Sequence, residues 1–320
     1  MTTILTETPA LRPPPRLRGA VGHAIRRRPS AAAGAALLAL FAVVALLAPW
    51  LRPFPVDRPS GAVFGHPSVH HWLGLDDAGV DVVSLLLEGG RVSLFIGVAA
   101  MAVSLLIGGA VGVTAGYFGG AVEGLLMSVT DLVLVVPYLP LMIVIAAIWG
   151  PSIGHVVLAI GLLQWTWTAR LVRAQVKSVR ERTWVRRAQA MGAGHGRVLV
   201  RHVVPQIAPL LVALAVLSVA YSVFAETALA FVGLGDPTRV SWGSMIHDAF
   251  LRTSVSAGAW WVVVPPGVCV ALVVVGCHLL GRGVEEGLNP RLAVSYLSPR
   301  TFRVLRSGED EQGAEGVTGA

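Results

Sequence analysis

The sequence predicts an all-α membrane protein with six transmembrane helices and both termini in the cytoplasm. Apolar residues make up 54% of the 320-residue chain and charged residues only 13%. A soluble domain carries about a quarter charged residues, so the surplus apolar surface must face lipid. Charge-free stretches at 92–122, 132–169 and 253–281 each exceed the roughly 20 residues needed to cross a bilayer. The chain therefore crosses the membrane several times.

The spans are expected in six places along the chain. The first is preceded by three arginines, but it is too long for the core of a cleavable signal and lacks a convincing cleavage site, so it is interpreted as an uncleaved anchor. The stretch 132–169 fits either one long helix or a pair broken at Gly150-Pro151. With the pair, the spans are 31–51, 92–117, 132–149, 153–169, 206–225 and 258–280.

The distribution of positive charge decides between the two arrangements. Of the 25 Lys and Arg residues, 20 lie before the first span, between the fourth and fifth, or after the sixth. A five-span arrangement would place the dense basic segment 170–205 outside, against the positive-inside bias. Basic clusters between apolar spans also fit membrane topology better than nucleic-acid binding, despite the net charge of +7.

The predicted organisation follows from these spans. Both cysteines, Cys269 and Cys277, lie inside the last apolar stretch, about 12 Å apart along a helix, which is too far for a disulfide. The parts are a basic cytoplasmic N-terminal tail (1–30), a first transmembrane helix (31–51), an extracytoplasmic loop (52–90), a transmembrane core (91–283) that includes the cytoplasmic loop 170–205, and a cytoplasmic C-terminal tail (284–320).

Motifs for catalysis are absent from the sequence. No glycine-rich phosphate loop occurs, and the one lysine, Lys177, follows no glycines, so nucleotide energy would have to come from another chain. The outer loop holds several potential metal donors, but their spacing fits no common zinc pattern and packing on the outer mouth is the better interpretation. These donors are His66, His70, His71, Asp76 and Asp77.

Small residues repeat every fourth position in the second span. Gly108, Gly112 and Gly116 give this helix a smooth face, which favours close approach of another helix backbone.

Acidic and proline residues mark candidate positions on a pathway or gate. Asp131 and Glu226 are costly within a bilayer, and because they lie near span ends we expect them to position other groups rather than relay protons. Pro137 and Pro140, together with Pro265-Pro266, are expected to kink or unwind their helices, and such breaks often border a pathway.

The cytoplasmic segment 184–205 predicts a helix-turn-helix knob. Trp184, Ala188 and Met191 recur at helical spacing, Gly192 suits a left-handed helix end, and Pro205 suits the first turn of the next span. Two amphipathic pieces around a small-residue turn fit docking into a protein groove better than lying on anionic lipid headgroups.

Several motifs, taken in their order along the chain, resemble the inner-membrane permease subunits of ATP-binding-cassette importers. The resemblance is to the dipeptide/oligopeptide/nickel group and its second permease type. The knob is similar to that family's ATPase-coupling motif at Ala188, Gly192, His202 and Pro205. Other matches run through residues 26–291. They are His71-Trp72-Leu73-Gly74, Gly79, Asp81, Gly90-Arg91-Val92-Ser93-Leu94, Ala115-Gly116-Tyr117-Phe118-Gly119-Gly120, Ala169-Arg170-Leu171-Val172-Arg173, Glu226-Thr227-Ala228-Leu229-Ala230-Phe231-Val232-Gly233-Leu234-Gly235, Ser241-Trp242-Gly243 and Asn289-Pro290-Arg291.

The sequence departs from the family pattern at four positions. Arg186 stands where the coupling motif has an acidic residue, and Arg187 where it has alanine. Val80 replaces an arginine of the outer loop, and Leu75 replaces a threonine. The charge reversal at Arg186 changes the salt bridge that the motif would make with an ATPase, so either the partner has changed to match or this subunit couples weakly.

The resemblance implies a non-catalytic half of a transmembrane heterodimer. Its partners would be a second permease subunit, two cytoplasmic ATPases, an extracytoplasmic solute-binding protein and membrane lipid, with no nucleic acid. ATP and magnesium would bind the ATPases, and this chain would hold no cofactor and no metal. Closure of the ATPases would push on the knob and switch the permease pair from inward- to outward-facing.

The sequence leaves alternatives open for the cargo and for the class of membrane protein. Few fixed charges and no converging metal donors lie in the predicted spans, which favours di- or oligopeptides over nickel or another small solute. A secondary transporter would need ion-coupling residues near mid-membrane, and the sequence offers only the marginal Asp131 and Glu226. A membrane anchor or assembly protein would not need the ordered coupling motif.

Overall fold

The computed structural model describes residues 28–288, and every regular element in this range is a helix, which confirms the predicted class. Most of both predicted tails, and Asn289-Pro290-Arg291, lie outside the described residues. In chain order the elements are α2 (Pro29–Leu51), α3 (Val82–Phe118), α4 (Gly120–Val135), α5 (Tyr138–Trp149), α6 (Ile153–Arg180), α7 (Thr183–Ala190), α8 (His195–Val198), the π-helical turn η1 (Leu199–Val203), α9 (Val204–Phe231), α10 (Trp242–Leu251) and α11 (Trp260–Leu288).

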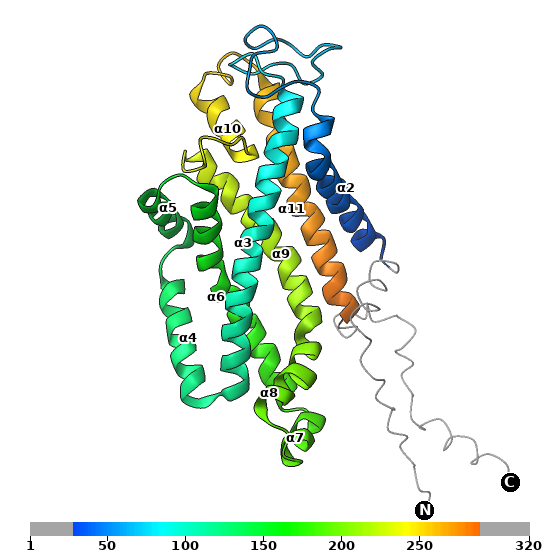
Figure 1. The fold of residues 1–320 in the computed structure, drawn as a ribbon, viewed down its shortest axis with the longest axis vertical. Helices are drawn as coiled ribbons and strands as arrows, with labels where there is room; N and C mark the ends of the chain where they lie inside the picture. Colours follow the sequence, from blue (N-terminus) through cyan, green and yellow to red (C-terminus); the bar gives the residue numbers. More distant parts are fainter. Residues whose placement is uncertain (1–27, 289–320) are drawn as a thin grey trace, which may run out of the picture.

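The long helices form an upright bundle with different structures at its two ends (Figure 1). The loop between α2 and α3 and the short helix α10 lie at one end, and α7 and α8 lie at the other. The first residues of α2 and the last of α11 point toward the α7 end. This arrangement agrees with the predicted separation of the outer loop from the basic segment.

Within residues 28–288, four helices are long and apolar enough to cross a membrane, namely α2, α3, the continuous run from α8 to α9, and α11. The bent pair α4–α5 adds a fifth if it counts as one span. The predicted span 153–169 forms the first part of α6, whose second part carries basic residues including Lys177 and Arg180. The six-span count stays a prediction.

Glycines on α3 bring this helix against α6. A Cβ atom on Gly108, Gly112 or Gly116 would lie within 2.5 to 2.7 Å of a backbone carbonyl oxygen of α6. Ordinary carbon contacts need about 3.5 Å, so only glycine permits this separation. The predicted smooth face is therefore confirmed, and α6 is the helix that approaches it.

Proline breaks the third predicted span at the expected position. α4 ends at Val135, Pro137 precedes α5, and the two helices meet at 87°. The predicted span 132–149 is therefore a bent pair rather than one helix. Pro140 lies in the first turn of α5, where its missing N–H costs no hydrogen bond, and α11 runs through Pro265 and Pro266 without unwinding.

α3 begins at Val82, so the last residues of the predicted loop 52–90 are helical. The Asp81 carboxylate accepts the N–H of Ser84 at 2.9 Å, which caps the first turn. Burial of Val82 and Leu85 then extends the apolar face of α3 into the predicted loop. The Trp261 indole donates to the carbonyl of Leu75 at 3.1 Å and fixes the loop on α11.

Candidate functional site

The knob at the α7 end is built around a glycine turn. Gly192 follows α7 with φ +81°, the left-handed conformation that was predicted for it. Its N–H donates to the carbonyl of Gln189 at 2.9 Å, and the N–H of Ala193 donates to the carbonyl of Ala188 at 3.1 Å. This pair of bonds is the Schellman arrangement, which satisfies the last carbonyls of a helix and reverses the chain.

The buried face of α7 combines one of the residues that recur at helical spacing with a neighbouring valine. Val185 and Ala188, three positions apart, are buried against the bundle, whereas Trp184 is 44% exposed and Met191 is 82% exposed. Of the three residues that recur at helical spacing, only Ala188 is therefore buried, and Val185 completes the buried face. Trp184 and Met191 instead form an apolar outer surface on the knob.

Two adjacent arginines stand on the exposed side of α7. Arg186 and Arg187 are both exposed, and no ion pair joins either to a described residue. Arg182 lies 5.8 Å from the centre of the Trp184 ring, within range of a cation–π contact. The outward surface of the knob thus combines apolar side chains with positive charge.

The second arm of the knob continues directly into α9. α8 and η1 join α9 without a break, so the knob is rigidly connected to an apolar helix. His202 lies half-buried in η1, and Pro205 occupies the first turn of α9, where its missing N–H leaves no bond unmade. Val198 and Val203 are buried in a cluster with valines of α6.

Tyr117 at the end of α3 anchors both arms of the knob. Its hydroxyl is 3.0 Å from Nδ1 of His195 and accepts the Gln189 side-chain amide at 3.3 Å. The Tyr117 side chain is 2% exposed, and its ring meets that of His195 edge to face at 5.7 Å. Tyr117 therefore links α3 to both arms of the knob.

A cavity of about 670 Å³ lies between α4, α5, α6, α9 and α11. Its volume falls within the range of ligand sites, about 300 to 1,000 Å³. Most of its wall is apolar, with aromatic side chains from three helices. Its lining includes Leu134, Pro137, Tyr138, Gln164, Thr166, Trp167, Ser218 and Tyr221.

Polar groups on the cavity wall are partly engaged with each other. The Gln164 amide donates to the carbonyl of Ser218 at 3.2 Å and accepts the Ser222 hydroxyl at 2.8 Å. Tyr138 and Tyr221 pack with ring centres 5.2 Å apart. The Tyr138 hydroxyl is buried and has no hydrogen-bond partner among residues 28–288. A bound polar ligand or water would satisfy it.

Two of the predicted pathway residues lie at this cavity or beside it. Pro137, at the bend between α4 and α5, lines it directly. Asp131 lies on α4 and accepts a hydrogen bond of 2.6 Å from Nη2 of Arg170 on α6. Closer to the knob, Glu123 binds Arg173 and Lys177, so acidic groups of α4 face basic groups of α6 at two levels.

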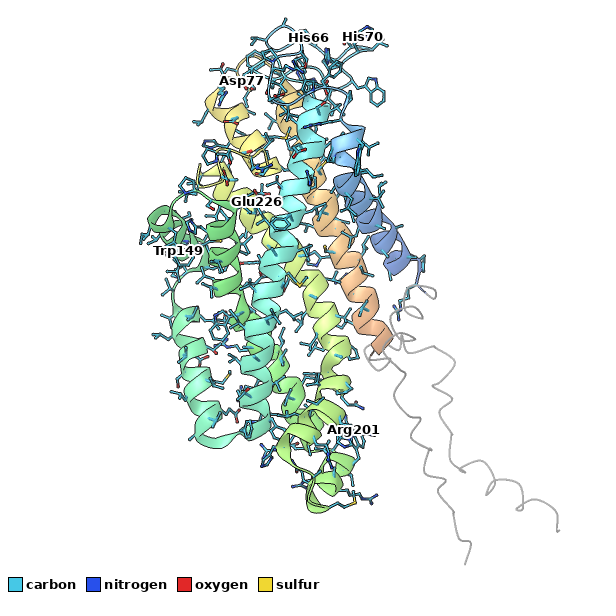
Figure 2. All side chains as sticks on the ribbon, viewed as in Figure 1. His66, His70, Asp77, Trp149, Arg201 and Glu226 are labelled. Atoms are coloured by element: carbon cyan, nitrogen blue, oxygen red, sulfur yellow. The ribbon has the colours of Figure 1, made fainter. Side chains whose placement is uncertain are left out.

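Glu226, the third predicted pathway residue, lies apart from the cavity. Figure 2 places it in the half of the bundle near the outer loop, and it is 2% exposed. The Ser93 hydroxyl donates to Oε2 of Glu226 at 2.9 Å and accepts the N–H of Trp242 at 3.1 Å. Glu226 therefore joins α9 to α3 and, through Ser93, to α10.

The potential metal donors of the outer loop are dispersed. Within residues 28–288 no three His, Cys, Asp or Glu side chains converge on one point. His71 pairs with Asp81 at 2.9 Å, and the His66 ring packs on Trp261 at 4.9 Å. In Figure 2, His66, His70 and Asp77 mark the loop at the outer end.

Asp76 and Asp77 have separate roles in holding that loop. The Asp76 carboxylate accepts the N–H groups of Ala78 and Val80, and burial nevertheless raises its pKa. Asp77 accepts a hydrogen bond of 3.1 Å from Arg252 and so joins the loop to the end of α10. Both carboxylates fit a structural role in the loop.

Several residues of these sites were not singled out for a role from the sequence. Tyr117 lies in the Gly116-Tyr117-Phe118 segment that was noticed only for its resemblance, and Gln164 and Tyr138 carry no local signal at all. Arg170 offered one usable sign, since a charge that ends an apolar stretch needs a partner within the membrane. Partners 39 positions apart cannot be paired from a single sequence.

The chain is similar to curated peptide permeases over most of its length. It is 32% identical to the dipeptide transport system permease protein DppC of Bacillus subtilis (strain 168), covering 84% of each chain. It is 37% identical to the oligopeptide transport system permease protein OppC of Mycobacterium tuberculosis (strain ATCC 25618 / H37Rv), covering 83% of this chain and 91% of that one. Residues 108–294 match the family described as binding-protein-dependent transport system inner membrane component. The chain is a multi-pass membrane permease and belongs to this family.

Proposed function

We propose that this chain is one half of the membrane pathway of an ATP-driven importer that carries di- or oligopeptides into the cell. The observation that carries the proposal is the combination of an exposed knob with a cavity between the helices connected to it. A second permease subunit would complete the pathway, two ATPases would bind the knob, and an extracytoplasmic binding protein would deliver cargo. ATP and magnesium belong to the ATPases.

The knob supplies the coupling step. Trp184 and Met191 give it an apolar surface that a groove on an ATPase would bury, and Arg186 and Arg187 add positive charge beside it. We expect Arg186 to meet an acidic residue on the partner. Because α8 and η1 continue into α9, a push on α7 would move α9 and, through Tyr117, α3.

The bend at Pro137 supplies a hinge beside the cavity. Since α4 and α5 meet at 87° and Pro137 lines the cavity, a change of this angle would alter the width of the passage. Glu226 would act as a positioning residue, which holds α10 at the outer mouth through Ser93.

The chemistry of the cavity favours peptides over a metal ion. Its wall is largely apolar, with amide and hydroxyl groups that suit peptide bonds, and it offers one histidine, His278, among its lining residues. Selective metal binding needs several converging donors. The relatives named above are permeases for dipeptides and oligopeptides.

Uptake in cells tests the cargo. An amino-acid auxotroph that lacks this gene is grown on di- to pentapeptides, and radioactive nickel uptake is measured in the same strain. We expect growth on peptides to be lost and restored by the intact gene, with nickel uptake unchanged. Peptide growth that survives the deletion, together with lost nickel uptake, would replace the peptide proposal with the nickel alternative.

A secondary transporter is tested by the energy source. In vesicles, uptake should follow ATP supplied to the ATPase side and should survive collapse of the ion gradients. Uptake that follows an ion gradient without ATP would favour the secondary-transporter class.

A further inference from the structure

The Asp131–Arg170 ion pair lies directly next to the cavity, on its side toward the knob. Asp131 precedes the lining residue Leu134 by three positions on α4. Arg170 follows the lining residues Thr166 and Trp167 by four and three positions on α6. Residues three or four apart share a helix face, so both charges stand one turn from the cavity wall.

Both charged side chains remain open to their surroundings. The Arg170 side chain is 45% exposed and the Asp131 side chain 58% exposed, although they are 2.6 Å apart. Charges at membrane depth face a bundle interior or a water-filled passage, because lipid cannot solvate them. A pair this exposed also contributes little to stability and separates easily. The exposure of both side chains therefore favours a water-filled passage that continues from the cavity.

We infer that Asp131 and Arg170 form an exchangeable site for the two charged ends of a zwitterionic peptide. Arg170 takes the terminal carboxylate and Asp131 takes the terminal ammonium, so one ion pair becomes two and the net charge of the site is unchanged. This matters because an apolar cavity penalises unpaired charges. The inference rests on the proposed peptide function. It names the residues that would recognise peptide ends on the side of the cavity toward the knob.

The hydroxyl of Tyr138, which has no partner in the described part of the chain, supports the same occupant. It is buried at the start of α5, and Tyr138 lines the cavity. A peptide with its ends near Asp131 and Arg170 carries backbone groups that can pair with this hydroxyl. The cavity thus offers apolar surface for side chains and polar groups for the peptide backbone.

The chain contains a matched control for the ion pair. Glu123 binds Arg173 and Lys177 between the same two helices, nearer the knob, and none of the three lines the cavity. Neutralising either pair removes an α4–α6 contact. Only the pair beside the cavity should change recognition of peptide ends.

Protection of an introduced cysteine tests the inference on the assembled complex. The two native cysteines are replaced by alanine, Leu134→Cys is introduced, and its alkylation is timed with tri-alanine, tri-alanine amide or N-acetyl tri-alanine at millimolar concentration. A peptide at twice its dissociation constant slows the reaction about threefold. We expect this protection from free tri-alanine, and much less from either blocked form.

The variants separate recognition from helix packing. Asp131→Asn with Arg170→Gln should abolish the protection by free tri-alanine, and Arg170→Lys should retain it. Glu123→Gln with Arg173→Gln should also retain it. Equal protection by all three peptides, no protection by any, or protection that survives neutralisation of the cavity pair overturns the inference. If one of these results is obtained while the wild-type complex still imports peptide, only the inference about Asp131 and Arg170 fails. If the wild-type complex imports no peptide, the proposed function fails as well.

Discussion

Gly112 offers a quantitative test of how closely α3 and α6 pack. In Gly112→Ala the new Cβ would lie 2.6 Å from the carbonyl oxygen of Ala169 and 2.7 Å from Cβ of Val172. Ordinary contact needs about 3.5 Å or more, so the helices must separate by roughly 1 Å. Overpacking of this kind costs about 1 to 3 kcal/mol. Replacing a helical glycine by alanine returns up to about 1 kcal/mol.

The net expectation is a loss of up to about 2 kcal/mol in Gly112→Ala. Gly109→Ala is the matched control, because nothing lies within 4 Å of the Cβ position at Gly109 on the same helix. That variant should keep or slightly raise stability. At about 2 to 4 °C per kcal/mol, Gly112→Ala should lower the unfolding midpoint by several degrees.

The assay is thermal unfolding of the detergent-solubilised protein, with all variants heated at one scan rate because the unfolding of membrane proteins is often irreversible. Equal midpoints for the two variants would refute the close contact between α3 and α6. If Gly109→Ala also unfolds at a lower midpoint than the wild type, the loss arises within α3 rather than from its contact with α6.

Two further predictions concern the ends of the bundle. Tyr117→Phe removes the hydroxyl that meets His195, so hydrogen exchange in α7 should rise about fivefold, as expected for a lost bond of about 1 kcal/mol; unchanged exchange would remove Tyr117 as an anchor. At the outer end, hydrogen bonds from Thr238 hold the pKa of Asp236 below its usual value. The carboxylate accepts the N–H of Ile153, so this attachment should persist above about pH 4 and weaken as the pH falls through the lowered pKa. Exchange of the Ile153 amide against pH measures this, with Asp236→Asn as the comparison that should lack the acid dependence.

Local signals in the sequence were sufficient for much of the architecture. The four-residue repeat of Gly108, Gly112 and Gly116 predicted a close helix contact, and Pro137 predicted a break. Gly192 predicted the turn of the knob. Each of these is a backbone requirement that one residue type satisfies, so it can be identified without knowledge of the neighbour.

The remainder depends on contacts between distant segments. Helical spacing singled out Trp184, Ala188 and Met191, but only the packing of α7 on α6 and η1 shows that Val185 and Ala188 are its buried residues. Glu226 was recognised as unusual, yet its contact with Ser93 lies 133 positions away. The cavity is likewise made by helices that are far apart in the chain.

The central claim is that the knob couples ATP hydrolysis to peptide movement. Gly192→Val and Gly194→Val separate this from general damage, since a Cβ at either position has open space, and only Gly192 has a positive φ. Valine cannot adopt that conformation without strain, so the first variant should distort the turn. The measurement is ATP hydrolysed per peptide imported by the reconstituted complex. We predict that Gly192→Val raises this ratio at least about tenfold, corresponding to a loss of about 1.4 kcal/mol in coupling, while Gly194→Val stays near wild type. Equal ratios in all three proteins would contradict the account.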